Sequence, residues 1–181
     1  MDQLEIIKTT ITITIKKRNG EIYNVIFDLD DYENVIKPRV GKIHIDGYGY
    51  ARGLDKNNKL KLIKIHRLIM EDKLTQANNE IDHKNNDTLD NRKSNLRLCT
   101  HQENLQNRKK FQNGRSIYKG VSWHKGCEKW TAQYYLNTKK YHIGCFDLEE
   151  DAGRAYDATI RNIFKEFAKF NFPLEHDQSA I

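Results

Sequence analysis

Residues 81–108 of this chain have the sequence IDHKNNDTLDNRKSNLRLCTHQENLQNR, and they hold its most distinctive polar side chains. The pattern predicts a strand, a long polar loop, a second strand and a helix over residues 79–83, 84–94, 95–99 and 100–110. Thr100 and Glu103 have the T-x-x-E spacing of a capping box, which marks the start of the helix. Because this unit has few apolar side chains, it needs packing against the rest of the chain, or a bound metal, to be stable.

Four residues of this unit, Asp82, His83, Asn95 and Asn104, form the candidate reaction centre. The predicted topology brings the end of the first strand and the first turn of the helix toward one point. A carboxylate and an amide oxygen are hard ligands that suit Mg²⁺ or Mn²⁺, which leaves other coordination positions for water and a substrate phosphate. A neighbouring imidazole can activate water by accepting its proton. Each residue alone is more often structural, so only their combined spacing favours a catalytic site.

At these residues the chain resembles the HNH nuclease family, in the subgroup found in phage and intron-encoded homing endonucleases. The family pattern runs from an Asp-His pair through an Asn-Leu to an Asn on a helix. Here the intervals are 12 residues from His83 to Asn95 and 9 from Asn95 to Asn104. The upstream sequence IHRLI, residues 65–69, is also similar to the usual start of the motif. The resemblance implies a metal-dependent DNA endonuclease built on a ββα-metal unit.

The resemblance also implies a role for each residue of the centre. His83 would be the general base that deprotonates the attacking water, and Asn95 would orient its imidazole through a side-chain hydrogen bond. Asp82 and Asn104 would hold one divalent metal ion, Mg²⁺ or Mn²⁺. The family's third letter is Asn here instead of His. Asp82 is then the only obvious ligand carboxylate, and weak metal affinity is expected.

Three cationic side chains, Arg92, Lys93 and Arg97, flank the centre. They would bind phosphates next to the cleaved bond, or they would only keep a polar loop solvated. The sequence favours neither interpretation.

Residues 1–59 predict a β-rich module without a catalytic constellation. Strands are expected over residues 7–15, 21–27, 42–52 and 60–65, the last of them at the start of the next unit. Asn19-Gly20 predicts a tight hairpin turn between the first two strands. Asp30 and Glu33 predict a capped short helix, which Pro38 would end.

Residues 116–174 predict three strands followed by an amphipathic helix. The strands are expected over residues 118–123, 130–136 and 140–146, and Asp147 with Glu150 would cap the helix. This stretch resembles the Apetala or ethylene-response-factor (AP2/ERF) type of DNA-binding domain. The resemblance is carried by Tyr118-Lys119-Gly120-Val121, Trp130, Ile143-Gly144-Cys145-Phe146, Ala155-Tyr156-Asp157 and Asn171-Phe172-Pro173.

That family places its three-stranded sheet in the major groove of DNA. The resemblance therefore implies DNA-facing side chains at Lys119, Ser122, His124, Gln133, Tyr135, Lys140 and His142. Trp123 is the aromatic residue that we expect to contact DNA, whereas Trp130 and Phe146 are expected in the core. Lys119 and Lys140 keep a charge but lack the planar fork of arginine, so the family's base preference does not carry over.

The composition agrees with a DNA partner. The 181 residues contain 31 Lys+Arg against 25 Asp+Glu, a net charge of +6, with the excess in the middle and last thirds. Apolar runs are too short for a membrane helix, and residues 1–17 do not form a secretory signal. Three cysteines without a C-x-x-C motif argue against a disulfide framework or a four-cysteine zinc site. We expect a phage-encoded protein of the bacterial host cytoplasm that is not secreted, with no membrane and no obligate protein partner.

Together these patterns predict an α+β protein with three parts and a frayed tail: residues 1–59, 60–112, 116–174 and 175–181. The expected function is a site-preferring DNA endonuclease that hydrolyses phosphodiester bonds. With one metal and one base, it would cut one strand per binding event. The alternative is a DNA-binding regulator of the AP2/ERF type with a relic HNH unit.

Overall fold

The computed structural model describes residues 9–45, 49–54, 59–108, 110 and 114–174. It is a mixed α and β structure with small sheets, as predicted, and it divides into two compact units, Met1–Leu98 and Cys99–Ile181. The boundary falls inside the predicted unit 60–112, at the end of its second strand. The predicted tail 175–181 lies outside the described residues, as does the start of the first predicted strand. None of the described helices is long and apolar enough to cross a membrane.

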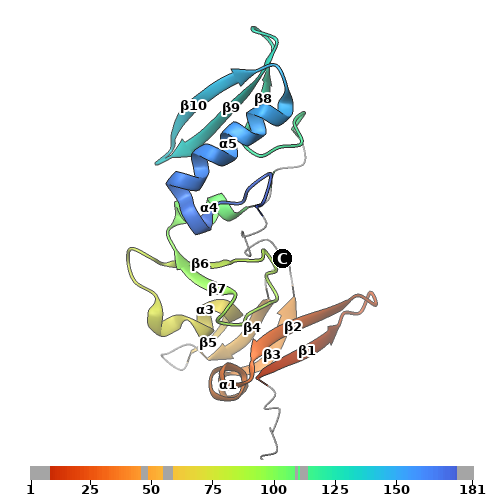
Figure 1. Cartoon of the computed structure of the whole chain (residues 1–181). Coiled ribbons are helices and arrows are strands. Elements are labelled where there is room, and N and C mark those ends of the chain that lie inside the picture. Colours follow the sequence, from red (N-terminus) through yellow and green to blue (C-terminus); the bar gives the residue numbers. More distant parts are fainter. Residues whose placement is uncertain (1–8, 46–48, 55–58, 109, 111–113, 175–181) are drawn as a thin grey trace, which may run out of the picture. The chain divides into compact units, whose positions relative to one another are not determined.

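The first unit begins with an antiparallel hairpin of β1 (Thr10–Lys16) and β2 (Ile22–Asp28), which confirms the predicted alternation (Figure 1). In this register the isoleucines of β1 lie opposite Tyr23, Val25 and Phe27. Its threonines lie opposite Asn24, Ile26 and Asp28. Gly20 occupies the turn with a φ of +90°, a conformation that glycine adopts without strain.

The helical segment after β2 differs from the prediction. It comprises α1 (Leu29–Asp31), a π-helical turn η1 (Tyr32–Ile36) and α2 (Lys37–Arg39), and none of them has a side-chain N-cap. Asp30 accepts from Asn34 at 2.6 Å, and Glu33 pairs with Lys37 at 2.7 Å. Pro38 lies in the first turn of α2, where its missing N–H is tolerated, so it does not end the helical segment.

A three-stranded antiparallel sheet follows, with the order β3 (Val40–Ile45), β4 (Gly49–Leu54) and β5 (Leu60–Lys64). The single strand predicted over residues 42–52 is therefore two strands. Next come α3 (Ile65–Ile69) and the 3₁₀ turn η2 (Glu71–Lys73). The core of this unit combines the inner hairpin face with α3 and the two strands of the predicted centre, and its fully buried members are Val25, Phe27, Ile36 and Ile65.

The predicted strands and helix of residues 81–108 are confirmed. They are β6 (Glu80–His83), β7 (Leu96–Cys99), which pairs with β6, and α4 (His101–Asn107), which begins the second unit. Thr100 caps α4 through the expected capping box: its hydroxyl accepts from the Glu103 N–H, and the Glu103 carboxylate accepts from the Thr100 N–H at 2.8 Å.

The rest of the second unit is an antiparallel sheet covered on one face by a helix. The sheet has the order β10 (Lys139–Phe146), β9 (Lys129–Leu136) and β8 (Val121–His124), and α5 (Glu149–Phe164) leads into the 3₁₀ turn η3 (Lys165–Phe167). The three strands and the helix confirm the prediction, but the predicted cap does not form. Asp147 pairs with Lys129 at 3.1 Å instead, and the N-cap position is Leu148.

Among the described glycines of the second unit, Gly120 has the least space for a side chain. Its φ is +76°, and a Cβ built there would lie 2.1 Å from ring carbons of Tyr156 on α5. Both the backbone conformation and the space therefore require glycine at the entrance to β8.

We predict that Gly120→Ala destabilises the second unit by about 2 to 5 kcal/mol, because it adds left-handed backbone strain to a steric clash. Gly114→Ala is the matched control, since its Cβ would meet only the end of the Lys110 side chain at 3.9 Å. Urea unfolding of the two variants measures the difference. Equal stabilities would contradict this account of the packing.

Candidate active site

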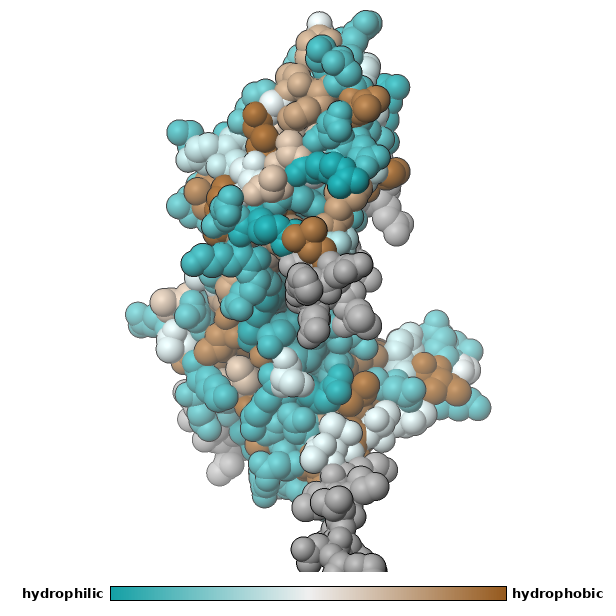
Figure 2. All heavy atoms as spheres, in the orientation of Figure 1, coloured by the Kyte–Doolittle hydropathy of each residue, from teal (hydrophilic) through white to brown (hydrophobic). Residues whose placement is uncertain are grey.

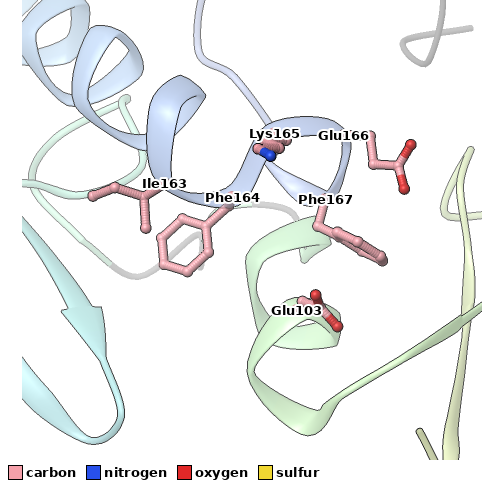
Figure 3. Close-up of a pocket in the computed structure, with 6 residues that line it drawn as sticks. All are labelled: Glu103, Ile163, Phe164, Lys165, Glu166 and Phe167. Carbon is pink, nitrogen blue, oxygen red and sulfur yellow. The ribbon is translucent and has the colours of Figure 1, made fainter.

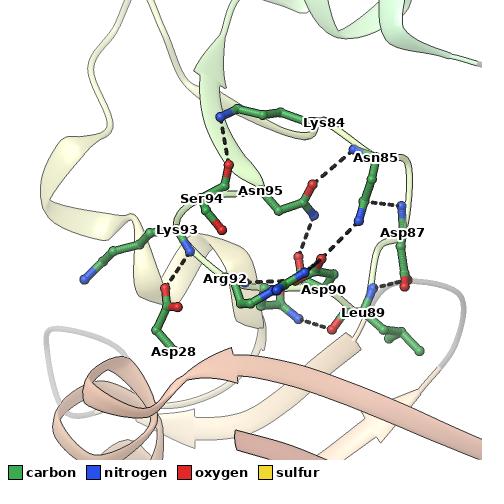
Figure 4. A network of polar contacts seen from close by, with 11 residues as sticks. Asp28, Lys84, Asn85, Asp87, Leu89, Asp90, Arg92, Lys93, Ser94 and Asn95 are labelled. Atoms are coloured by element: carbon green, nitrogen blue, oxygen red, sulfur yellow. Dashed lines mark hydrogen bonds and ion pairs between the residues drawn. The ribbon is translucent and has the colours of Figure 1, made fainter. Parts of the chain in front are cut away.

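The loop between β6 and β7 is held by polar contacts to Asp90 (Figure 4). The carboxylate of Asp90 is 2% exposed, and it accepts from Arg92 at 2.8 and 2.7 Å and from the Asn85 side chain at 3.0 Å. Asp87 adds a local turn by accepting from the Leu89 N–H at 2.9 Å. A buried carboxylate with this many charge-assisted bonds fixes the loop conformation.

Asn95 belongs to the same network, and its contacts differ from those implied by the family pattern. Its carboxamide donates to the Asp90 carbonyl at 2.8 Å and accepts from the Asn85 N–H at 3.0 Å. Both ends of the side chain thus bind the main chain of the loop instead of the His83 imidazole. A buried amide satisfies its hydrogen bonds with the nearest carbonyl and N–H, and here these belong to the loop.

Strand β2 braces the loop from the other side. Ile26 donates to the Leu89 carbonyl at 2.9 Å and accepts from the Asn91 N–H at 2.8 Å, forming a parallel bridge to Asp90. Asp28 accepts from the Lys93 N–H at 2.8 Å. The loop is therefore joined to the N-terminal hairpin by main-chain hydrogen bonds.

His83 lies at the end of β6 and is 5% exposed. Burial lowers the pKa of His83 below its ordinary value, and interactions with the Asn91 side chain and with the Asp82 and Asp87 carboxylates oppose that shift. Asn91, which is fully buried, is thus the asparagine that acts most directly on His83. A neutral imidazole at physiological pH can accept a proton.

A second histidine packs against His83. His66 on α3 is 5% exposed, and its ring lies edge-on to the His83 ring at a centroid distance of 5.0 Å and an angle of 89°. Burial, together with the proximity of His83, lowers the pKa of His66 to about 3. His66 therefore stays neutral across the physiological range. His66 belongs to the segment 65–69 that resembles the start of the HNH motif, but no pattern in the sequence indicates that it lies next to His83.

The cations that flank the centre all have carboxylate partners. Arg97 donates to Asp82 at 2.9 and 2.7 Å, and Arg92 binds Asp90 as described above. The Lys93 ammonium pairs with Asp31, which is 2% exposed. These side chains are already used inside the unit, so binding a phosphate would require each of them to share its charge with a carboxylate.

The donors at the centre suit a hard divalent cation. Among the described residues, no group of three or more His, Cys, Asp or Glu side chains is arranged to hold a metal ion. Mg²⁺ needs fewer protein ligands than such a group provides, because it commonly keeps several waters and is bound by one or two carboxylates together with substrate phosphates. The Asp82 carboxylate meets that requirement, although Arg97 competes for it. Oxygen donors of this kind fit Mg²⁺ or Mn²⁺ better than Zn²⁺.

The fourth residue of the predicted centre, Asn104, lies on α4 in the second unit. The second unit also contains a pocket of about 500 Å³, lined by Glu103 and by residues 163–167 at the end of α5 and in η3 (Figure 3). Glu103 is the capping-box residue of α4, and none of the predicted site residues lines this pocket.

The predicted DNA-facing residues of the second unit lie in three environments. Strand alternation and register place six of them on the sheet face away from α5: Ser122, His124, Gln133, Tyr135, Lys140 and His142. Trp123 alternates to the other face, where its ring lies 5.2 Å from that of Trp130. Lys119 is held by its ammonium, which donates to the carbonyls of Gln106 and Arg108 at the end of α4, and burial lowers its pKa to about 8.

The buried neutral His66 predicts a pH-dependent stability. Its pKa is about 3 in the folded state against 6.5 in the unfolded chain, so the unfolded state binds more protons between these values. Stability from this group is therefore present above pH 6.5 and is lost as the pH falls toward 3, by about 2 kcal/mol between pH 7 and pH 5. Urea unfolding at both pH values should show a loss that is smaller in His66→Gln than in wild type by this amount; the buried His83 accounts for the loss that remains in the variant. The exposed His44, replaced by Gln, is the control, and an equal effect of both substitutions would argue against the assignment.

Comparison with known proteins places this centre in a recognised segment. Residues 64–106 match the family model described as HNH endonuclease, which spans α3, β6, β7 and most of α4. No solved structure matches the chain. Over 90 residues, which are 50% of this chain and 74% of the other protein, the sequence is 33% identical to Protein 3.8 of Escherichia phage T7. The chain therefore belongs to the family of that phage protein, and it carries within it a segment of the HNH endonuclease type.

Proposed function

We propose that this protein is a metal-dependent DNA endonuclease that hydrolyses a phosphodiester bond. The observation that carries the proposal is the placement of a neutral His83 beside Asp82 at the end of β6, inside the segment that matches HNH endonucleases. A supercoiled plasmid assay with Mg²⁺, with and without EDTA, tests it. Plasmid binding without cleavage would instead favour the non-enzymatic regulator.

In the proposed mechanism His83 accepts the proton of the attacking water. Burial keeps the imidazole neutral, and the Asn91 side chain with the nearby carboxylates stabilises the imidazolium that forms. His66 limits the rotation of the His83 ring by its edge contact. Asn95 acts on His83 through the loop, since its own hydrogen bonds join Asn85 to Asp90.

Asp82 and Asn104 would hold one Mg²⁺ or Mn²⁺ ion, which when bound supplies stabilisation of the charge on the phosphate and on the leaving 3′ oxygen. Asn104 enters this proposal from the family pattern. The ion pair between Asp82 and Arg97 weakens metal binding, because the carboxylate must divide its interaction between the guanidinium and the metal. Weak metal affinity follows from this competition.

The second unit is proposed to bind duplex DNA in the manner of an AP2/ERF domain. Support comes from the three-stranded sheet and from the six polar side chains of its outer face, Ser122, His124, Gln133, Tyr135, Lys140 and His142. Arg92, Lys93 and Arg97 would contribute to phosphate binding only if each divided its charge between a phosphate and its present carboxylate partner. A single centre would nick one strand per encounter.

His83→Ala should lower the single-turnover cleavage rate by at least about 10²-fold and leave DNA affinity unchanged, because the imidazole acts on water. The wild-type rate should also fall as the pH drops through the pKa of His83, which lies below 6.5, and be flat above it. His44→Ala, at an exposed position, is the control. A variant that cleaves at the wild-type rate would exclude His83 as the base.

Asp82→Asn should raise the Mg²⁺ concentration for half-maximal cleavage by roughly tenfold or more, because a neutral amide is a weaker ligand than a carboxylate. Asn104→Ala should have a smaller effect that Mn²⁺ partly restores. Asp72→Asn, an exposed substitution in η2, serves as the control for charge. If the metal titrations of all three variants coincided with wild type, the metal would bind elsewhere.

A further inference from the structure

The hairpin of β1 and β2 projects from the body of the first unit (Figure 1). The sequence of its tip is cationic. Lys16, Lys17 and Arg18 follow one another at the end of β1, against a single nearby acid, Glu21. Lys17 lies over the Tyr23 ring at 4.6 Å, and the Tyr23 hydroxyl donates to Glu21 at 2.9 Å. Within the described part of the chain, Lys16 and Arg18 are exposed and form no ion pair.

This availability sets the tip apart from the cations around the reaction centre. Arg92, Lys93 and Arg97 all bind carboxylates of the same unit. Phosphate groups of a long polyanion therefore meet less competition at Lys16 and Arg18 than at the centre itself.

One face of the hairpin is built for a polar surface and not for a core. Thr12, Thr14 and Asn24 are exposed on it, and the Thr14 hydroxyl donates to the Asn24 side chain at 3.0 Å. Hydroxyl and amide side chains are common partners of DNA phosphates, and a two-stranded ribbon has dimensions that fit the major groove. Ile22, 64% exposed on the same face, adds an apolar contact, and Figure 2 shows the hairpin as mostly hydrophilic to neutral with a hydrophobic patch.

The base of the hairpin is fixed to the catalytic loop. Ile26 exchanges main-chain hydrogen bonds with Leu89 and Asn91, and the Asp28 carboxylate accepts from Lys93. Ile22 lies four residues before Ile26 in β2, toward the turn of the hairpin, a span of about 13 Å at ~3.3 Å per residue. Ile22 thus lies about four base pairs from the loop when the distance is measured along one DNA strand at ~3.4 Å per phosphate.

We propose that the β1–β2 hairpin is a DNA-binding arm, in which Lys16 and Arg18 contact phosphates and the face with Thr12, Thr14 and Asn24 lies against the duplex. This inference rests on the proposed endonuclease function for its ligand. The arm adds affinity for a duplex bound beside the catalytic loop, because its base and that loop are hydrogen-bonded to each other.

The experiment compares the full-length double variant Lys16→Ala/Arg18→Ala with wild type and with Lys37→Ala/Lys73→Ala, which removes the same charge from α2 and η2. Affinity for a duplex is measured in EDTA across a salt series. Loss of two phosphate contacts should make the slope of log affinity against log salt shallower by about 1.8. The affinity deficit of the variant should then shrink about 12-fold between 50 and 200 mM salt.

Single-turnover cleavage at saturating protein gives the second measurement. The arm variant should keep the wild-type rate constant within about twofold, because the arm acts in binding. A loss of rate at saturation would place these residues in the chemistry and overturn the arm. An affinity and a salt slope equal to those of the control variant would overturn it as well.

The proposed function fails separately. If wild type bound the duplex but did not cleave plasmid in Mg²⁺ or Mn²⁺, the endonuclease would be excluded, and the binding comparison would still decide the role of the hairpin. Urea unfolding curves of the two double variants check that both are as fully folded as wild type under the conditions of the binding measurements.

Discussion

The reaction centre depends on a buried carboxylate, that of Asp90. The loop between β6 and β7 has too few apolar side chains to be held by hydrophobic burial, so its shape comes from polar contacts. Arg92 and Asn85 satisfy the Asp90 side chain, and its carbonyl accepts from Asn95. A buried charge without these partners would cost several kcal/mol, which makes the network cooperative. His83 is thus positioned by hydrogen bonds more than by packing.

Local signals in the sequence predicted the local structure well. The alternation of isoleucine and threonine gave β1, and the T-x-x-E spacing gave the capping box of α4, because each pattern stabilises its element through neighbouring residues. Other side chains bind partners that their spacing in the sequence does not indicate. Asp147 pairs with Lys129 instead of capping α5, and Asn95 binds the main chain of the loop instead of His83. His66 was not foreseen, since nothing in the spacing indicates that α3 packs against β6.

Net charge alone is a poor guide to where this protein would meet a polyanion. Arg92, Lys93 and Arg97 surround the proposed site, yet each is bound to a carboxylate that is itself nearly buried. Breaking such a pair leaves an acid without a partner in a poorly solvated position, so the cation is costly to redirect. The cations that remain available are the exposed ones without acidic neighbours.

The ammonium of Lys119 has a consequence for exchanging parts between related proteins. By donating to the last carbonyls of α4, it ties that helix to the entrance of β8, and the Lys169 N–H donates to the same Gln106 carbonyl at 3.2 Å. Helix α4 therefore shares its stability with the C-terminal sheet, although it lies in the HNH segment. A chimera cut at Gly114, between α4 and β8, would separate the helix from its supports. A chimera should instead be joined before Cys99, where the second unit begins. A replacement for the C-terminal sheet must then include its own equivalent of α4.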